Sequence, residues 1–378
     1  MIFRRPFRVF SCLLLSAGLT GALHAAHHTA RSTQPTDEIN PEAYRSAIVV
    51  DAATGRILFE DKADVQNPPA SVTKLMTFLI VAERIKQGEL KLDTPVTVTA
   101  EAARTGGSQV YLVDKEHITV DDMLYALMVQ SANDAATALA IQVAGSKEAF
   151  VELMNAKARE LGMTRTVFQS PHGLPPGRGQ EADLTTARDL AILARRLMTE
   201  TDILRYSSVR ERDFRHQNGK VMQMRTHNHL LALVPGCDGL KTGYYRQAGF
   251  SLVATVQRNG RRIIAVILGS PESKLRDITT TRLIARGFIA LGPLPGAAAA
   301  ASVTPPSSAG PVASPAPATG GPQPQPATGP SAGPVATPTN GGNAPGIRAM
   351  PLRPEDMLPA ADETPGPEVH VDTSGAKH

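Results

Sequence analysis

Three short motifs stand in a fixed order along this chain of 378 residues, and their side chains are the ones that acyl transfer requires. They are Ser71-Val72-Thr73-Lys74, Ser131-Ala132-Asn133 and Lys241-Thr242-Gly243. A serine supplies a nucleophile, an amine can activate it, and a lysine beside a hydroxyl on a strand can hold a carboxylate. The motifs together therefore point to an enzyme that forms an acyl intermediate on a chain-terminal amide. Ser-x-x-Lys alone would not, because it recurs at 374–377.

The first motif opens a strongly apolar segment, 71–86, whose spacing predicts a buried helix. Residues three apart share a helix face, so Lys74 would lie within reach of the Ser71 hydroxyl. Burial and a second cation such as Lys241 would both lower the Lys74 pKa, and only the neutral amine can act as a base. The alternative is a helix cap at Ser71 and a surface lysine at position 74. The first motif by itself leaves both interpretations open.

The second motif interrupts two apolar helical segments. In a catalytic interpretation, the Ser131 hydroxyl passes a proton to a departing amine and Asn133 hydrogen-bonds the substrate backbone. In a structural interpretation, Asn133 and Asp134 cap the helix that follows. The second interpretation is the stronger one for this motif taken alone.

The third motif precedes a predicted hairpin. Gly243 would let a ligand backbone approach the strand closely, because glycine has no Cβ. Lys241 and Thr242 would then present a charge and a hydroxyl to a terminal carboxylate. The alternative is an edge-strand lysine that discourages aggregation.

Strand signals lie at both ends of the region 46–291, and helical signals lie between them. Asn259-Gly260 joins two apolar runs and is the strongest short hairpin signal in the chain. This order predicts an α+β fold, in which one antiparallel sheet built from both chain ends packs against a mostly helical subdomain. The expected strands are 46–51, 56–60, 250–257 and 261–268, and the expected helices are 71–86, 121–129, 135–143, 147–161, 184–198 and 279–291.

The two ends of the chain differ from this region. A basic head, an apolar stretch and clustered alanines predict a signal peptide over 1–26, and 27–43 is a polar lead-in. The predicted catalytic domain covers 44–292. Residues 293–378 are rich in Pro, Ala and Gly, which predicts a disordered tail.

Composition excludes several classes of function. Only Cys237 remains once the signal peptide is removed, so no internal disulfide is expected, and the 42% hydrophobic content allows an apolar core. The net charge of +4 comes without a Lys/Arg run or any Trp, which gives no support for nucleic-acid binding. The ten histidines show no ligand spacing, so neither a metal nor a cofactor is expected.

The three motifs and their neighbours resemble the low-molecular-mass D-alanyl-D-alanine carboxypeptidases, which are penicillin-binding proteins of the serine β-lactamase/transpeptidase-like superfamily. The resemblance runs from about residue 43 to residue 290, with motif spacings of about 60 and 110 residues similar to those of that family. It also includes four short flanking motifs: Gly107-Ser108, Met128-Val129-Gln130, Pro171-His172-Gly173-Leu174 and Thr185-Thr186-Ala187-Arg188-Asp189-Leu190.

The resemblance implies a mechanism on peptidoglycan stem peptides. Ser71 attacks the penultimate D-Ala carbonyl with Lys74 as general base, Ser131 relays the proton to the leaving D-Ala, and water hydrolyses the acyl-enzyme. β-Lactams would acylate the same serine. For substrate binding, the resemblance implies Lys241, Thr242 and Arg276 at the terminal carboxylate, Asn133 on the peptide, and the N–H groups of Ser71 and Tyr244 as the oxyanion hole beside Gly243.

Three alternatives use the same motifs. They are a D,D-endopeptidase on peptidoglycan cross-links, a class A-like β-lactamase, and a non-catalytic β-lactam-sensing or wall-binding module. For the β-lactamase, Glu181-Ala182-Asp183-Leu184-Thr185 is a near match to the deacylation loop, with Thr in place of Asn. Neither a second β-rich domain nor an amphipathic membrane helix is visible in the sequence, so a soluble, exported, periplasmic enzyme without a strong membrane anchor is expected. The oligomeric state stays open.

Overall fold

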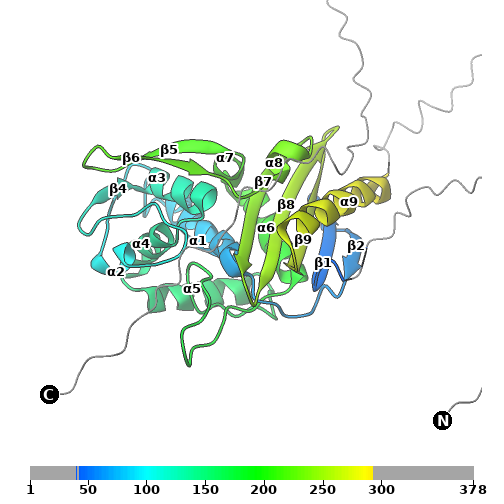
Figure 1. Cartoon of the computed structure of the whole chain (residues 1–378), viewed down its shortest axis with the longest axis horizontal. Helices are drawn as coiled ribbons and strands as arrows, with labels where there is room; N and C mark the ends of the chain where they lie inside the picture. Colours follow the sequence, from blue (N-terminus) through cyan, green and yellow to red (C-terminus); the bar gives the residue numbers. More distant parts are fainter. Residues whose placement is uncertain (1–39, 41, 293–378) are drawn as a thin grey trace, which may run out of the picture. The chain divides into compact units, whose positions relative to one another are not determined.

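The computed structural model describes residue 40 and residues 42–292, and its centre is a five-stranded antiparallel sheet (Figure 1). The strand order is β2-β1-β9-β8-β7, so strands from the beginning and the end of the described chain lie side by side. The predicted α+β fold is therefore confirmed. The strands are β1 (Ser46–Asp51), β2 (Ile57–Asp61), β7 (Cys237–Tyr245), β8 (Gly249–Arg258) and β9 (Arg261–Ser270).

The hairpin between β8 and β9 forms where the sequence predicts it. Asn259 and Gly260 both have positive φ, 49° and 72°, which a two-residue type I′ connection requires. The inner residues of β8 and β9 are buried, because helices cover both faces of the sheet. One face packs on α9 (Ser273–Leu291) and the other on α6 (Ala187–Glu200). β7, the edge strand that carries the third motif, pairs with β8 from Cys237 to Tyr245.

The starts of α6 and α9 differ from the predictions. The helix α6 begins at Ala187 rather than 184, because Leu184 and Thr185 pair with Val167 and Asn67 and the Thr186 hydroxyl caps the helix. The closing helix α9 begins at Ser273, six residues before the predicted start. Its first turns carry polar side chains, which hide the apolar periodicity.

The helical subdomain surrounds α1 (Lys74–Lys86), whose residues 74–81 are all buried. The predicted helix 71–86 is divided, because its first turn, Ala70–Thr73, is a 3-10 helix. The helix predicted at 121–129 begins as α3 (Val120–Tyr125) and ends in a π-helical turn, Ala126–Gln130. The remaining helices are α4 (Asn133–Ala144) and α5 (Lys147–Glu160), with the short helices α2 (Ala100–Ala103), α7 (Ile203–Ser207) and α8 (Leu230–Leu233).

Two small antiparallel strand pairs in the middle of the chain were not predicted. One pairs β3 (Pro95–Thr97) with β4 (His117–Thr119), and the other pairs β5 (Glu211–Arg215) with β6 (Val221–Arg225). The second pair carries a readable signal, since Asn218-Gly219 stands in its turn and Gly219 has φ +83°. Charged residues on the exposed face of β5 and β6 conceal their alternation.

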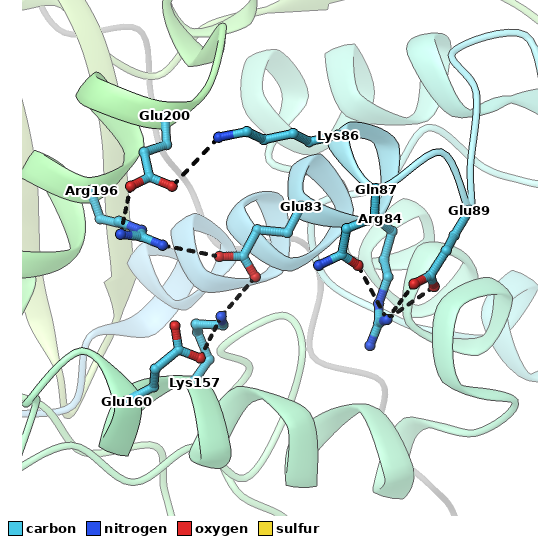
Figure 2. Close-up of polar contacts among 9 residues, drawn as sticks. All are labelled: Glu83, Arg84, Lys86, Gln87, Glu89, Lys157, Glu160, Arg196 and Glu200. Atoms are coloured by element: carbon cyan, nitrogen blue, oxygen red, sulfur yellow. Dashed lines mark hydrogen bonds and ion pairs between the residues drawn. The ribbon is translucent and has the colours of Figure 1, made fainter.

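A network of ion pairs joins the outer ends of α1, α5 and α6 (Figure 2). Glu83 of α1 lies 2.9 Å from Lys157 Nζ of α5 and 4.0 Å from Arg196 of α6. Glu200 pairs with Arg196 at 2.5 Å and with Lys86 at 3.8 Å. Pairs of this kind contribute about 0.2–1 kcal/mol each, and here they connect α1 to both α5 and α6. The orientation of α1 matters because Lys74 is its first residue.

The predicted signal peptide (1–26), most of the lead-in and the tail (293–378) lie outside the described residues. Within the described part of the chain, none of the helices combines the length and the apolar character needed to cross a bilayer.

Candidate active site

The Ser71 hydroxyl and the Lys74 amine face each other at the start of the buried helix. Lys74 Nζ lies 2.9 Å from Ser71 Oγ and 2.7 Å from the backbone carbonyl oxygen of His172, and Lys74 is fully buried. Burial lowers the Lys74 pKa well below its usual value, and the positive charge of Lys241 lowers it further, against the opposing effect of Asp183 and Asp134. The alternative of a solvated surface lysine is therefore wrong. A neutral amine here can donate to His172 and accept the Ser71 hydroxyl proton.

The turn that presents Ser71 has an unusual backbone. Ala70 has a positive φ of 49°, a conformation that costs an L-residue about 1–2 kcal/mol. Gly173 packs directly against this turn, because a Cβ at 173 would lie 2.0 Å from the Ala70 carbonyl oxygen. The chain holds Ser71 in place through this close contact between two segments about 100 residues apart.

The second motif lies where the π-helical turn meets α4. Ser131 is buried and left-handed, with φ 61° and ψ 30°. The expected cap is wrong, since Ala132 is the N-cap of α4 and makes no side-chain hydrogen bond there. The Asp134 carboxylate instead accepts the backbone N–H groups of Val110 and Leu112, the latter at 3.0 Å.

In the part of the chain that the structure describes, the side-chain amide nitrogen of Asn133 makes a hydrogen bond and the amide oxygen does not. Its Nδ2 donates to the Gly106 carbonyl at 2.8 Å, and its backbone N–H donates to the Ser108 carbonyl at 2.8 Å. Among the described residues, the buried Oδ1 atom has no hydrogen-bond donor. Buried polar atoms normally have partners, so this oxygen is suited to accept an N–H group from a ligand.

The third motif lies on the edge strand β7, against the Ser71 turn. Lys241 and Thr242 are both buried, and Lys241 Nζ donates to the Thr242 carbonyl at 3.0 Å. A Cβ at Gly243 would lie 2.5 Å from the Pro69 carbonyl oxygen and 3.1 Å from the Ser71 nitrogen. Only glycine fits at this contact. Gly243 thus serves the packing of the protein's own backbone, a reason that differs from the ligand approach predicted from sequence.

Arg276 is buried at the N-terminal turn of α9. Its Nε donates to Asp277 at 2.9 Å and its Nη2 to Ser273 at 3.1 Å. The guanidinium lies 6.0 Å from the centre of the Phe250 ring, and Phe250 stacks on Tyr244 at 4.0 Å. Arg276 therefore lies at the same end of the sheet as Tyr244, the residue that follows the third motif.

Two residues with structural importance at the site were not assigned from sequence. The His172 carbonyl receives the Lys74 amine, and the Asp183 carboxylate holds the segment in front of His172. Asp183 accepts the N–H groups of Gln169 (2.5 Å) and Ser170 (3.0 Å) and the hydroxyls of Ser170 and Thr73. Burial raises the Asp183 pKa, and these hydrogen bonds oppose the rise. The motif Pro171-His172-Gly173-Leu174 was the available sequence signal, but the role of a backbone carbonyl cannot be recognised from residue type.

Apart from Arg276, the residues named from sequence belong to elements that pack on the Ser71 turn or on α1. β7 packs on the Ser71 turn, and the π-helical turn before Ser131 packs on α1. Across residues 40 and 42–292, there is no group of three or more His, Cys, Asp or Glu side chains that could hold a metal ion. The arrangement is suited to serine acylation assisted by an amine.

The sequence profile of the D-alanyl-D-alanine carboxypeptidases matches residues 30–272. The chain is 35% identical to D-alanyl-D-alanine carboxypeptidase DacF of Bacillus subtilis over 253 residues, 67% of this chain and 64% of that protein. It is 36% identical to DacC of Escherichia coli over 267 residues, 69% of this chain and 65% of that protein. The matched region thus spans just under two thirds of these two relatives.

Solved structures share the fold. D-alanyl-D-alanine carboxypeptidase DacD from Francisella tularensis matches with a TM-score of 0.61 and 29% identity, over 69% of this chain and 75% of that one. Penicillin-binding protein D2 from Listeria monocytogenes, in its ampicillin-bound form, matches with a TM-score of 0.58 and 30% identity, over 65% of this chain and 97% of that one. The profile match, the relatives and the shared fold together establish that the chain belongs to the D-alanyl-D-alanine carboxypeptidase family.

Proposed function

We propose that this protein is a serine-type D-alanyl-D-alanine carboxypeptidase that removes the terminal D-Ala from peptidoglycan stem pentapeptides. The observation that carries the proposal is the 2.9 Å contact between Ser71 Oγ and the buried Lys74 amine. An amine kept neutral by burial can take the hydroxyl proton as the oxygen attacks, which a solvated ammonium cannot do. Membership of the family supplies the substrate class.

The reaction would proceed in two halves through Ser71. In the first, Ser71 Oγ attacks the carbonyl carbon of the penultimate D-Ala while Lys74 accepts its proton. Ser131 then passes a proton to the departing D-Ala nitrogen as the amide bond breaks. In the second half, water attacks the ester, Ser71 leaves with a proton, and the shortened peptide is released. The negative oxygen formed in each half would lie between the N–H groups of Ser71 and Tyr244, and one such donor contributes about 3–4 kcal/mol.

Substrate recognition would use the open edge of β7. An extended peptide can pair with an edge strand through backbone hydrogen bonds. The Asn133 Oδ1 atom, which has no donor among the described residues, would accept a peptide N–H. The terminal carboxylate would lie near Lys241, Thr242 and Arg276. Gly243 keeps the strand close enough to Ser71 for one peptide to reach both. β-Lactams would acylate Ser71 in the same position.

The β-lactamase alternative would need a carboxylate that is free to activate water. Glu181, its nearest sequence candidate, has an exposed side chain, and both Asp183 oxygens already accept hydrogen bonds. A D,D-endopeptidase would use the same geometry with a longer leaving group. A non-catalytic module would have no use for a desolvated lysine beside the serine.

We also propose that the protein is exported to the periplasm through the signal peptide predicted to end near Ala26, because its substrate is a wall polymer. N-terminal sequencing of the mature protein from a periplasmic fraction tests this, and a mature chain that begins at Met1 in the cytoplasm would contradict it.

The test of the function is intact-protein mass spectrometry of the full chain with benzylpenicillin over time, followed by D-Ala release from a stem pentapeptide. We expect a long-lived adduct that maps to Ser71 and is absent in Ser71→Ala, which should keep the wild-type unfolding midpoint. Release of D-Ala from the pentapeptide would support the carboxypeptidase, and cleavage of cross-linked dimers alone would favour the endopeptidase. Rapid penicillin turnover without an adduct would favour the β-lactamase, and neither adduct nor turnover would favour the binding module.

A further inference from the structure

The segment between β6 and α8, residues 226–229, crosses from the second motif to the sheet. On one side, the N–H group of Arg225 donates to the Gln130 side chain at 3.2 Å, and Gln130 immediately precedes Ser131. On the other side, α8 packs against β7. The segment therefore spans the helical and sheet sides of the proposed active site.

The far end of the segment is attached to the Arg276 pair. His229 Nδ1 lies 3.0 Å from Asp277 Oδ2, and the other oxygen of Asp277 accepts from Arg276 at 2.9 Å. His227 lies between these two attachments. Asn228 beside it is buried and, among the described residues, its Nδ2 has no acceptor. The segment thus carries polar groups that the surrounding protein leaves unused.

The charges that act on His227 are cationic. Lys241, His229, Lys74 and Arg276 are the groups whose positive charge lowers its pKa. The carboxylate of Asp277 already contacts His229 and accepts a hydrogen bond from Arg276. Burial is the largest cause that lowers the His227 pKa, to about 4, and Lys241 is the next. Within residues 40 and 42–292, no hydrogen bond to the His227 ring is formed. His227 is therefore a neutral, unpaired imidazole among cations.

We propose that His227 is a specificity-determining residue that donates a hydrogen bond to the terminal carboxylate of the substrate. This inference rests on the proposed function. A carboxylate placed among Lys241, Arg276 and His227 adds a negative charge to a group of cations, so it raises the affinity of His227 for a proton. The imidazole then takes one proton from solvent, and both of its nitrogens become donors. Substrate binding is thereby linked to proton uptake.

The test measures the Kd of a peptide ending in D-Ala-D-Ala for the Ser71→Ala protein, by NMR titration at pH 5, 6, 7 and 8. Ser71→Ala prevents turnover, so the measured Kd is an equilibrium constant. We expect Kd to rise by up to tenfold per pH unit between the free-state pKa of His227, about 4, and its higher bound-state pKa, and to level off above the latter. The same peptide with a C-terminal amide should bind weakly at every pH, because it lacks the anion.

Two substitutions separate His227 from Lys74, whose charge also acts on His227 and whose pKa is also lowered. In His227→Gln, the affinity at pH 6 should fall about tenfold or more, as for the loss of a charge-assisted hydrogen bond, and the pH dependence should flatten. In His227→Arg, a fixed positive charge should restore affinity without pH dependence. His117→Gln, at an exposed histidine on β4, is the matched control and should behave as the parent does.

An unchanged pH profile of Kd in His227→Gln would overturn the inference. A flat profile in the Ser71→Ala parent would also overturn it, and that measurement does not depend on whether a variant at position 227 folds. Penicillin labelling and D-Ala release by the wild type are read separately. If they succeed while the proton linkage is absent, His227 is not involved and the carboxypeptidase proposal stands. If penicillin labelling and D-Ala release both fail, the proposed function itself is contradicted, whatever the result at His227.

Discussion

The backbone carbonyl of His172 accepts a hydrogen bond from the Lys74 amine at 2.7 Å. This contact uses one amine proton and leaves the nitrogen lone pair available to the Ser71 hydroxyl, 2.9 Å away. An uncharged lysine in the active site therefore has a fixed orientation as well as a lowered pKa. The segment that carries His172 is as much a part of the activation of Ser71 as the lysine itself.

The first prediction concerns the protonation of Lys74. Because its pKa is lowered, acylation of Ser71 should rise with pH through that pKa and then level off where the amine is neutral. Lys74→Arg should lower the acylation rate by about a thousandfold or more, since a guanidinium stays charged at any pH used. Stopped-flow acylation by a fluorescent penicillin between pH 4 and pH 9 measures both. A rate for Lys74→Arg within tenfold of the wild type would rule out Lys74 as the base.

Gly243→Ala tests the close approach of β7 to the Ser71 turn. The added methyl group would lie 2.5 Å from the Pro69 carbonyl oxygen, so strand and turn must separate. We expect the acylation rate to fall about a hundredfold and the free energy of unfolding to fall by about 1–3 kcal/mol. Gly106→Ala is the control, because a Cβ there meets no atom within 4 Å. Equal effects of the two substitutions would show that this contact does not position Ser71.

Asp183 should be required to hold the His172 segment. In Asp183→Ala, the buried N–H groups of Gln169 and Ser170 lose their acceptor, which should cost about 2–4 kcal/mol of stability and slow acylation. Asp183→Asn keeps one acceptor oxygen and should recover most of both. Urea unfolding and penicillin acylation measure the two effects.

Glu181→Gln is the matched control for Asp183, since Glu181 is exposed on the same segment. It should leave both stability and the lifetime of the penicillin adduct unchanged. A much longer adduct lifetime in Glu181→Gln would instead identify Glu181 as the residue that activates the deacylating water.

Acid should destabilise the protein through buried histidines. The pKa of His172 is lowered to about 3, first by burial and then by Lys74, from 6.5. The folded protein therefore binds fewer protons than the unfolded chain between these values, and stability falls as the pH drops below about 6.5. A single histidine contributes a slope of up to about 1.4 kcal/mol per pH unit in this window. Urea unfolding at pH 4.5, 5.5, 6.5 and 7.5 gives the slope, which His172→Gln should reduce. An identical slope in that variant would assign the acid sensitivity to other groups.

The sequence alone determined the fold class, the family and the residues to examine. The hairpin at Asn259-Gly260, the apolar run before and after Lys74, and the three motifs are local signals, because turn chemistry and helical periodicity depend on neighbours in the chain. The split of 71–86 into a 3-10 turn and α1 could not be read in the same way. It depends on Gly173 and Gly243, which press on Ala70 and Ser71 from distant segments.

Tertiary structure decided how the motifs are used. Sequence could name Lys74 but could not distinguish a surface lysine from a desolvated one, since burial depends on everything packed around α1. Arg276 shows the same limit, because it is buried by the packing of α9 on the sheet, where the Phe250 ring of β8 lies beside it. The roles of the His172 carbonyl and the Asp183 carboxylate were hidden for a further reason. Both act by holding backbone, and the contacts of a backbone atom are set by the fold and not by residue type.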